Sequence, residues 1–527
     1  MNDSARGGSQ GGTGVAAEVA VAGVDTQQLL QSMHWYDGFV VALANPGFLI
    51  ATLGYTIGSL GALGALAVWA GSMVIGVMQN KIYSEPAAMF PHRSGGVPIY
   101  AFEGWRKYFS FAGPLAAVGY WAGWTTVLSI FGLTVGSLAQ AEWFPHLTWS
   151  FHFVINLTVP RLIAIGLIVF VWVINAVGVR PAVWLGYVTG ALLMIPLAMF
   201  IVVPYFTGAW GTSHLTNLIG GAGQPAGWKL VMVYLYLNGW SSYGVEACAT
   251  FAPEYHDPKR DTVLALRRAA MFSLVVYALM PLGLGGVLSQ QTINKNPLTY
   301  YALALSRITG GGEIVSGLVV AFMIASFVLA MNSATMDGSR ALYGISQSGM
   351  TVKWLGKLNK HHVPARAMTL DMAVNVALVL FLSSTLAILA ASNLGYILCH
   401  VLALSGVVLL RRDRPDWPRA LRLGRPWLVA AVVLAVANLA FIVIGAPSFS
   451  ITGYGGYAEL LIGIGVLVAA CLLYVYRRVV EDRQPVRLRQ PSTEDWQSVP
   501  ALAAGGLAGP LAPVPSGVGS GLVTEDG

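Results

Sequence analysis

Long apolar segments, separated by short polar stretches, run along most of the chain. A bilayer core about 30 Å thick requires about 20 mainly apolar residues in each helix that crosses it. The pattern predicts twelve spans, numbered in chain order: residues 35–59, 61–84, 111–138, 155–178, 181–206, 228–252, 263–288, 313–338, 368–388, 390–410, 427–446 and 457–476. The polar, small-residue segments 1–33 and 479–527 are predicted to be disordered tails.

The composition supports an all-α integral membrane protein. Hydrophobic residues make up 56% of the chain and charged residues only 10%, whereas soluble proteins carry roughly 25% charged residues. Cys248, Cys399 and Cys471 all fall inside predicted spans, which argues against a disulfide framework and against a zinc site. We therefore expect no metal and no cofactor.

The basic residues are distributed unevenly, and their distribution predicts the orientation. Most of the 30 Lys and Arg residues lie in the segments that follow the even-numbered spans. Cytoplasmic loops carry such an excess of positive charge. We expect a multi-pass protein of the plasma (inner) membrane with both termini in the cytoplasm. The net charge of +7 is weak evidence for a nucleic-acid or anionic-lipid partner, because the basic residues are spread unevenly. We expect the lipid bilayer, and no nucleic acid, as a partner.

Two predicted spans carry an interruption. Span one contains Asn45-Pro46-Gly47, and span six contains Ser242-Tyr243-Gly244 followed by the single carboxylate Glu246. Proline and glycine break or kink a helix, and an ionisable residue at membrane depth suggests a functional site. A plain proline kink in span one stays open as an alternative.

The interruptions lie five spans apart, so the second is inverted relative to the first. Corresponding interruptions in two halves are typical of transporters built from inverted repeats. Half-helix N-termini attract an anionic group, and free carbonyl groups can hold an ammonium group. The pattern therefore predicts a zwitterionic substrate, an amino acid or a close relative.

Three motifs resemble those of the amino acid–polyamine–organocation (APC) superfamily of transporters. They are Glu85 to Tyr100, then Gly244-Val245-Glu246 with Pro253-Glu254 and 257–260, and Ser339-Arg340-Ala341-Leu342-Tyr343 with Pro364. The resemblance implies the LeuT-type fold of five plus five inverted spans with two further helices. Residues 34–206 would form the first repeat, 207–410 the second, and 411–478 spans eleven and twelve.

The resemblance also implies substrate-binding residues. In span one, Asn45, Gly47 and Phe48 occupy the place of the family's glycine-rich carboxylate cradle. Here Pro46 offers no N–H, and Asn45 adds a side-chain amide. The other expected members come from span six (Trp240, Ser242, Tyr243 and Gly244), from an aromatic row in span three (Tyr120 and Trp124), and from span ten (Tyr396 and His400). Simple packing or lipid contact is the alternative for the aromatic row.

The coupling ion stays open between a proton and sodium. Glu246 is the candidate for proton coupling or ammonium binding, and a structural hydrogen-bond acceptor is the alternative. Span five has no lysine or acid, so a lysine in place of a sodium site, which some family members use, is not expected. Ser326 and Ser333 in span eight could contribute to a sodium site, although serine in a membrane helix more often bonds its own backbone.

The sequence thus predicts a secondary active transporter of amino acids or related organic amines that works by alternating access, and not an enzyme. A polyamine or organic-cation carrier is the first alternative, although most acids other than Glu246 fall at span ends or in loops. The second alternative is a non-transporting membrane sensor or scaffold built on a permease fold.

Overall fold

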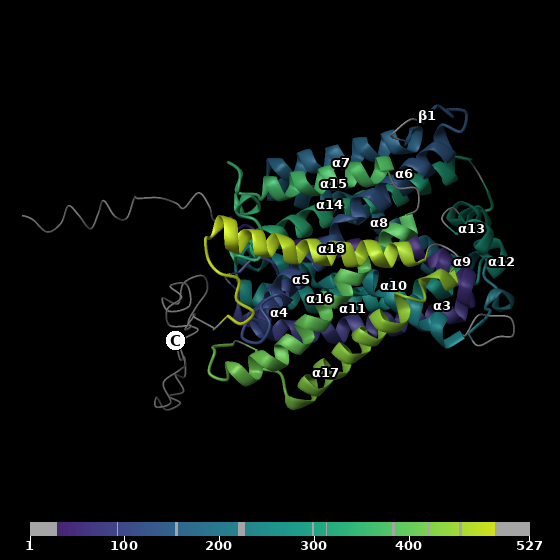
Figure 1. Cartoon of the computed structure of the whole chain (residues 1–527). Helices are drawn as coiled ribbons and strands as arrows, with labels where there is room; N and C mark the ends of the chain where they lie inside the picture. The colour runs from purple at the N-terminus through teal and green to yellow at the C-terminus, as the bar shows by residue number, and fades with distance from the viewer. Residues whose placement is uncertain are drawn as a thin grey trace, which may run out of the picture.

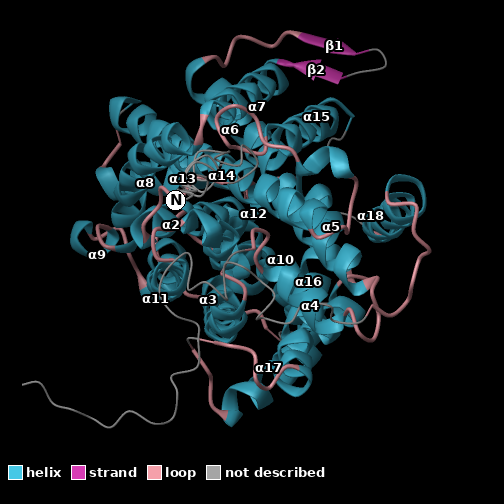
Figure 2. Ribbon diagram, turned by 90° about the vertical axis from the view of Figure 1, so that its left-hand side faces the viewer, coloured by secondary structure: helices cyan, strands magenta, loops and turns pink. Residues whose placement is uncertain are grey.

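The protein is described by a computed structural model that covers residues 29–490 except 92, 153–155, 220–226, 298–299, 312, 382–384, 420 and 453–455. Most of the two predicted tails, residues 1–28 and 491–527, lies outside the described residues. Long helices run side by side and form one bundle (Figure 1). Viewed along the bundle, α10 lies near the middle, and α7, α17 and α18 lie at the periphery (Figure 2).

Helices make up most of the described chain. They are α2 (Trp35–Ala42), α3 (Ala44–Met89), α4 (Val97–Trp105), α5 (Ala112–Thr125), α6 (Val127–Trp143), α7 (Val159–Val177), α8 (Val179–Ile201), α9 (Pro204–Thr207), α10 (Gly227–Tyr243), α11 (Pro258–Gly285), α12 (Gln290–Lys295), α13 (Tyr300–Thr309), α14 (Glu313–Gln347), α15 (Ala365–Phe381), α16 (Thr385–Asp413), α17 (Arg425–Ala440) and α18 (Tyr457–Tyr476). Short 3-10 or π-helical segments are η1 (Thr212–His214), η2 (Gly244–Glu254), η3 (Lys353–Gly356), η4 (Phe441–Gly445), η5 (Phe449–Thr452) and η6 (Arg477–Glu481).

Nine helices in the described part of the chain are long and apolar enough to cross a membrane. The other three predicted spans fall on shorter or interrupted helices. Span one is divided between α2 and the start of α3. Span six is divided between α10 and η2, and span nine corresponds to α15, which has 17 residues. The count of twelve spans and the five-plus-five arrangement stay predictions.

Gly61 separates the first two predicted spans inside the continuous element α3. Its φ of 74° lies in the left-handed region, which glycine adopts without the steric cost of a Cβ atom. The carbonyl oxygen of Thr216 lies where a Cβ atom on Gly61 would be placed. The chain therefore turns at Gly61, next to the predicted boundary between residues 59 and 61.

Two regions differ from the sequence prediction. The fold is not purely helical, because β1 (Ser150–His152) and β2 (Asn156–Thr158) form an antiparallel hairpin in which Phe151 pairs with Leu157. This hairpin takes up the beginning of predicted span four, where aromatic and β-branched residues favour strand. The predicted loop between spans seven and eight contains α12 and α13. The hairpin, α9, α12 and α13 all lie at the same end of the bundle, on the right in Figure 1.

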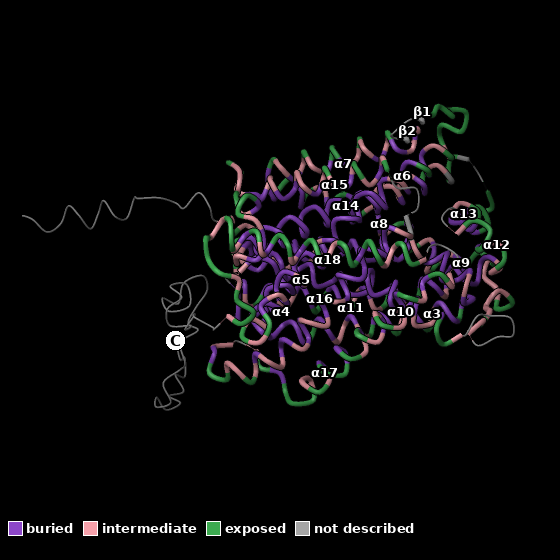
Figure 3. The backbone as a smooth tube through the Cα atoms, in the orientation of Figure 1, coloured by how far each residue is buried: buried purple, intermediate pink, exposed green. Residues whose placement is uncertain are grey.

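Buried side chains fill the middle of the bundle, and exposed positions follow its outer helices (Figure 3). Many exposed residues on these outer helices are large and apolar: Val169 and Phe170 on α7, Val436 on α17, and Leu461 and Leu472 on α18. Contiguous exposed apolar surface is rare on soluble proteins. The periphery of the bundle is therefore suited to contact lipid.

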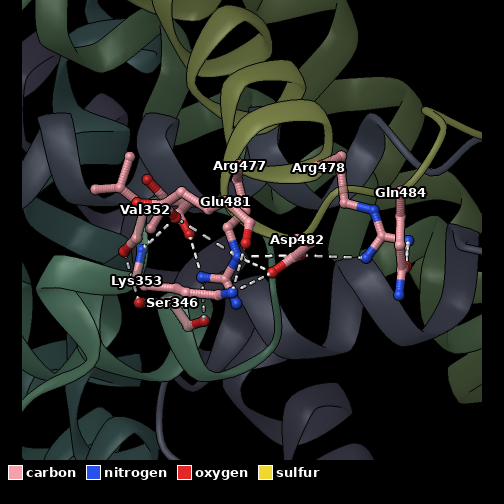
Figure 4. Close-up of polar contacts among 9 residues, drawn as sticks. Ser346, Val352, Lys353, Arg477, Arg478, Glu481, Asp482 and Gln484 are labelled. Atoms are coloured by element: carbon pink, nitrogen blue, oxygen red, sulfur yellow. Dashed lines mark hydrogen bonds and ion pairs between the residues drawn. The ribbon is translucent and has the colours of Figure 1, made fainter.

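The end of α18 is held to the segment that follows α14 (Figure 4). Arg477 donates to the Thr351 carbonyl oxygen at 2.8 Å and to Asp482 at 3.0 Å. Lys353 forms an ion pair with Asp482 at 2.9 Å and donates to the Glu481 carbonyl oxygen at 2.8 Å. The Lys353 and Arg477 cations together hold the pKa of the Asp482 carboxyl below its usual range, although partial burial acts in the opposite direction.

Candidate functional site

The two interrupted helices touch each other in the interior of the bundle. The α-helix of span one breaks at Leu43, so that Asn45 and Pro46 lie in the first turn of α3, where proline is tolerated. The α-helix of span six ends at Tyr243, and Gly244 begins the 3-10 segment η2. A Cβ atom on Gly244 would lie 2.7 Å from Asn45 Oδ1 and 3.3 Å from Trp124 Cζ2.

Both interruptions therefore lie within a few residues of the places that the sequence predicted, and both are compact. The helix of span one is interrupted by a single turn residue, and that of span six changes its hydrogen-bond spacing without an extended segment. A 3-10 stretch beside an α-helix has poorer hydrogen-bond geometry and often marks a functional hinge.

Aromatic rings form one side of this region. The Phe48 ring lies 4.9 Å from Trp240, 5.7 Å from Trp124 and 5.4 Å from Phe131, measured between ring centroids. The Trp240 indole N–H donates to the Gly123 carbonyl oxygen at 2.8 Å, which fixes that ring against α5. Phe131 was not among the residues predicted from the sequence, because an apolar residue in an apolar span carries no distinguishing signal.

Several buried polar atoms around the contact have no hydrogen-bond partner among the described residues. They are both side-chain polar atoms of Asn45, Trp124 Nε1, the hydroxyl groups of Tyr120 and Tyr243, and Glu246 Oε2. An unsatisfied buried polar group costs about 1–3 kcal/mol. Such a concentration is a poor arrangement for stability alone, and it suits a site that offers donors and acceptors to a ligand.

Two predicted site residues are occupied by contacts within the protein. Ser242 Oγ shares a 2.5 Å hydrogen bond with Ser72 Oγ and lies 2.9 Å from the Asn238 carbonyl oxygen. Gly47 packs against α14, where an added Cβ would lie 3.2 Å from the Ser326 carbonyl oxygen. Their part in substrate binding stays a prediction.

Glu246 lies next to Tyr396 and His400 of span ten. The Tyr396 hydroxyl donates to Glu246 Oε1 at 2.5 Å, and His400 Nε2 lies 3.9 Å from the same oxygen. His400 Nδ1 shares a 2.8 Å hydrogen bond with the Tyr83 hydroxyl, and the Tyr243 ring packs edge-on against the imidazole. The Tyr396 hydroxyl thus binds one carboxylate oxygen of Glu246, whereas His400 Nε2 forms no hydrogen bond and Glu246 Oε2 has no hydrogen-bond partner in the described structure.

Two further carboxylates, at the ends of predicted spans eight and nine, are buried in the bundle. Asp337 on α14 and Asp371 on α15 are both almost completely buried. Thr250 Oγ1 on η2 lies 2.6 Å from Asp337 Oδ1, and the Trp121 indole N–H donates to Asp371 Oδ1. Both acids belong to predicted spans eight and nine, so the rule that singled out Glu246 could have identified them as well.

The residues proposed for a sodium site behave differently from each other. Ser326 Oγ donates to the Phe322 carbonyl oxygen of its own helix at 2.9 Å, whereas Ser333 Oγ is buried and has no partner in the described region. No group of three or more His, Cys, Asp or Glu residues suited to a metal ion occurs among the described residues. A cavity of about 480 Å³ lies elsewhere, lined by Trp35, Lys259 and Arg268 among others.

Comparison with known proteins identifies the family. The sequence profile described as "Amino acid permease" matches residues 38–467, which is most of the chain. This protein belongs to the amino acid permease family. The match begins at α2 and ends within α18, so it includes both interrupted helices and every predicted site residue.

Relatives of this permease are named as transporters. An amino-acid permease of Bacillus subtilis is 24% identical over 67% of this chain and 73% of its own length. A lysine-specific permease of Lactococcus lactis is 25% identical over 68% of this chain and 71% of its own length. A polyamine transporter of Oryza sativa is 24% identical over 84% of this chain and 80% of its own length.

Three charged residues of the permease motifs, Glu85, Glu254 and Arg340, form ion pairs within the protein. Glu254 of η2 and Arg340 of α14 form a buried bidentate pair, with 2.9 Å between Arg340 Nη2 and Glu254 Oε2. Glu85 near the end of α3 pairs with Arg411 and Arg419. These motif residues therefore join separate helices, and they are distinct from the region around Asn45 and Gly244.

Proposed function

We propose that this permease carries an amino acid or a closely related organic amine across the plasma membrane by alternating access. The substrate would bind between the interruptions of spans one and six, in a twelve-span fold of five plus five inverted helices with both termini in the cytoplasm. Membership of the amino acid permease family and the names of the relatives support the substrate class.

One observation carries the proposal: unpartnered buried polar atoms gather where the first turn of α3 meets Gly244. The first backbone N–H groups of a helix have no partner within the helix and attract anions. The Asn45 amide, next to this N-terminus, is suited to a substrate carboxylate. It takes the place of the N–H that Pro46 lacks.

Glu246 is suited to the amino group of the substrate. Its Oε1 already accepts from Tyr396, and its Oε2 is free to accept from an ammonium group. Phe48, Trp124 and Trp240 would enclose the apolar part of the substrate, as aromatic side chains commonly do in ligand sites. The Glu246 carboxylate would then bind the ammonium end of the zwitterionic substrate, and the Asn45 amide would bind its carboxylate end.

A polyamine or organic-cation carrier is the second candidate, and one observation favours it. Asp337 lies buried on α14, which packs against η2, and Asp371 lies buried on the neighbouring helix α15, so more than one acidic group lies near Glu246. A polyamine needs more than one such contact, because each of its ammonium groups loses water on binding. The relative from Oryza sativa is named as a polyamine transporter.

Ligand-induced stabilisation of the purified permease tests the proposal. We would measure the melting temperature with L-lysine, L-leucine, putrescine and succinate. A ligand that binds only the folded form adds about 2.7 kcal/mol at a hundred times its dissociation constant. We expect the amino acids to stabilise the wild type and to lose at least tenfold in affinity for Glu246→Gln.

Glu142→Gln, at the far end of α6, is the matched control and should bind like the wild type. Stabilisation by putrescine alone would replace the amino-acid assignment with the second candidate. Stabilisation by succinate alone would contradict both, since succinate has no ammonium group for Glu246.

A further inference from the structure

Asp337 and Asp371 form a pair of buried carboxyl groups between helices α14 and α15. Asp371 Oδ2 lies 3.6 Å from the position that a Cβ atom on Gly338 would take, so it reaches the backbone next to Asp337. Asp337 Oδ2 and Asp371 Oδ2 are both buried without a hydrogen-bond partner among the described residues. Each acid therefore has one oxygen held by a neighbour and one oxygen available.

Neither acid is neutralised by a basic side chain in an ion pair of the described structure. Arg340 lies one helical turn from Asp337, but its guanidinium group forms the bidentate pair with Glu254. An ionised carboxylate buried without a cation is strongly destabilising. A positive charge must accompany these groups, and a proton is the one that requires no additional space.

The hydrogen bonds of Thr250 indicate where one proton lies. Thr250 Oγ1 is 2.7 Å from the Ala247 carbonyl oxygen and 2.6 Å from Asp337 Oδ1. A threonine hydroxyl has one proton to donate, and a carbonyl oxygen can only accept. If the Thr250 proton points to Ala247, the second short contact requires a proton on Asp337 Oδ1.

We propose that Asp337, with Asp371 beside it, is the proton-exchanging site of this permease and couples transport to a proton. The inference rests on the proposed transport function. When Asp337 releases its proton to water, the Thr250 hydroxyl turns from Ala247 to the new carboxylate. One O–H bond of Asp337 is broken and one hydrogen bond changes its acceptor, so charge and protons balance.

The position of Asp337 and Asp371 along their helices suggests the side of the membrane with which they exchange a proton. Asp371 lies in the first two turns of α15, and Asp337 lies in the second half of α14. The segment that connects these parts of the two helices contains Lys353 and Lys360, and the charge distribution predicts that it lies in the cytoplasm. Asp337 therefore stands between the region of Glu246 and the predicted cytoplasmic end.

Other titratable groups surround the pair and belong to several elements. Those that interact with Asp337 or Asp371 are Tyr120 of α5, Glu246 and Cys248 of η2, Arg340 of α14 and Tyr396 of α16. The Tyr120 hydroxyl faces Asp337 without forming a hydrogen bond of good geometry. A small rotation would let it donate to Asp337 Oδ2, the oxygen that has no partner among the described residues.

Infrared spectroscopy of the reconstituted permease tests the protonation directly. A protonated carboxylic acid has a C=O stretching band that neither a carboxylate nor an amide shares. We expect Asp337→Asn to remove one such band and Thr250→Val, which keeps the acid but removes its partner, to shift that band. Asp37→Asn is the matched control, because Asp37 is also buried but accepts hydrogen bonds from His34 N and Tyr187 and lies 4.0 Å from Arg180.

An unchanged acid band in Asp337→Asn, with a folded protein, would overturn the inference. A transport assay provides a second, independent test. With L-lysine as the probe, Asp337→Asn should keep exchange at equal pH and lose at least tenfold in accumulation driven by a pH gradient. Wild-type accumulation in this variant would also overturn it. If the wild type exchanges neither L-lysine nor putrescine, the proposed function fails, while the infrared result still decides the protonation of Asp337.

Discussion

At the scale of single residues, the candidate site depends on a glycine that brings two helices together. A side chain at position 244 would enter the space of Asn45 and Trp124, while Asn45 itself has no internal hydrogen bond among the described residues. The missing side chain of Gly244 allows the close approach, and the Asn45 side chain beside it is proposed to bind the substrate. Small changes here should therefore affect binding more than they affect the fold.

Gly244→Ala tests this directly. The added methyl group would lie 2.7 Å from Asn45 Oδ1, so the Asn45 side chain has to move out of its place. Overpacking of this kind costs about 1–3 kcal/mol. We expect a substrate affinity at least tenfold weaker, measured by ligand-dependent melting.

Gly465→Ala is the control for this substitution, because nothing lies within 4 Å of a Cβ atom at that position on α18. It should leave both affinity and stability close to those of the wild type. Unchanged affinity in Gly244→Ala would show that the contact between the interrupted helices is not part of the binding site.

At the scale of elements, charged residues tie the helix ends together at the basic end of the bundle. Glu103 of α4 is buried and accepts from Arg93 at 2.6 Å, Arg106 at 3.1 Å and Arg414, which directly follows α16, at 2.5 Å. Burial alone would raise the pKa of the Glu103 carboxyl, but the three guanidinium groups outweigh it and lower the pKa. Glu103 is therefore a junction between α4 and α16.

The lowered pKa predicts how stability changes with pH. A carboxyl group with a lower pKa in the folded state stabilises the fold above its unfolded pKa of about 4.3, and this contribution is lost as the pH falls through the folded value. We expect Glu103→Gln to lower stability by about 3 kcal/mol at neutral pH, because three arginines lose their partner. The melting temperature of the variant should lie closer to that of the wild type in acid.

Glu481→Gln provides the comparison, since Glu481 lies in a partly exposed ion pair with Arg477 at 3.8 Å, and exposed pairs contribute about 1 kcal/mol or less. A difference between Glu103→Gln and the wild type that stays constant down to strongly acidic pH would contradict the assigned role of Glu103.

The elements show where sequence reasoning succeeds. Each predicted span corresponds to one or more helices, and the interruptions at Pro46 and Gly244 were recognisable because proline and glycine act on the backbone locally. The hairpin β1–β2 and helices α12 and α13 were missed. The hairpin overlaps the beginning of predicted span four, and α12 and α13 lie in the predicted loop between spans seven and eight, where no apolar segment of membrane length indicates a helix.

At the scale of the whole molecule, the mainly helical membrane architecture follows from composition and the lengths of the apolar segments, while the site needs the three-dimensional arrangement. The sequence places Glu246, Asp337 and Asp371 in three different spans, and it does not fix the rotation of those spans about their axes. The structure joins Thr250 of η2 to Asp337 of α14. That contact depends on tertiary packing, which no local pattern specifies.

The sequence also does not reveal which motif residues hold helices together and which are free to bind a ligand. Glu85, Glu254 and Arg340 are prominent in the motifs, and the structure shows them in ion pairs between helices. Ser242 lies in the predicted site segment, and its hydroxyl is engaged by Ser72. A motif therefore indicates a region of the chain, and only the contacts separate residues that hold helices together from those whose polar atoms are free to bind a ligand.

The most direct test of the central claim is solute counterflow in proteoliposomes that contain the wild type, Asn45→Ala or Asn438→Ala. Vesicles loaded with unlabelled L-lysine, L-leucine or putrescine would be diluted into a trace of the same labelled solute. We predict transient accumulation by the wild type and by Asn438→Ala, whose buried amide on α17 donates to the Leu434 carbonyl oxygen away from the site, and at least a tenfold loss for Asn45→Ala. Equal counterflow in all three proteins would contradict a substrate site between the interrupted helices, and no counterflow in the wild type would contradict transport of these solutes altogether.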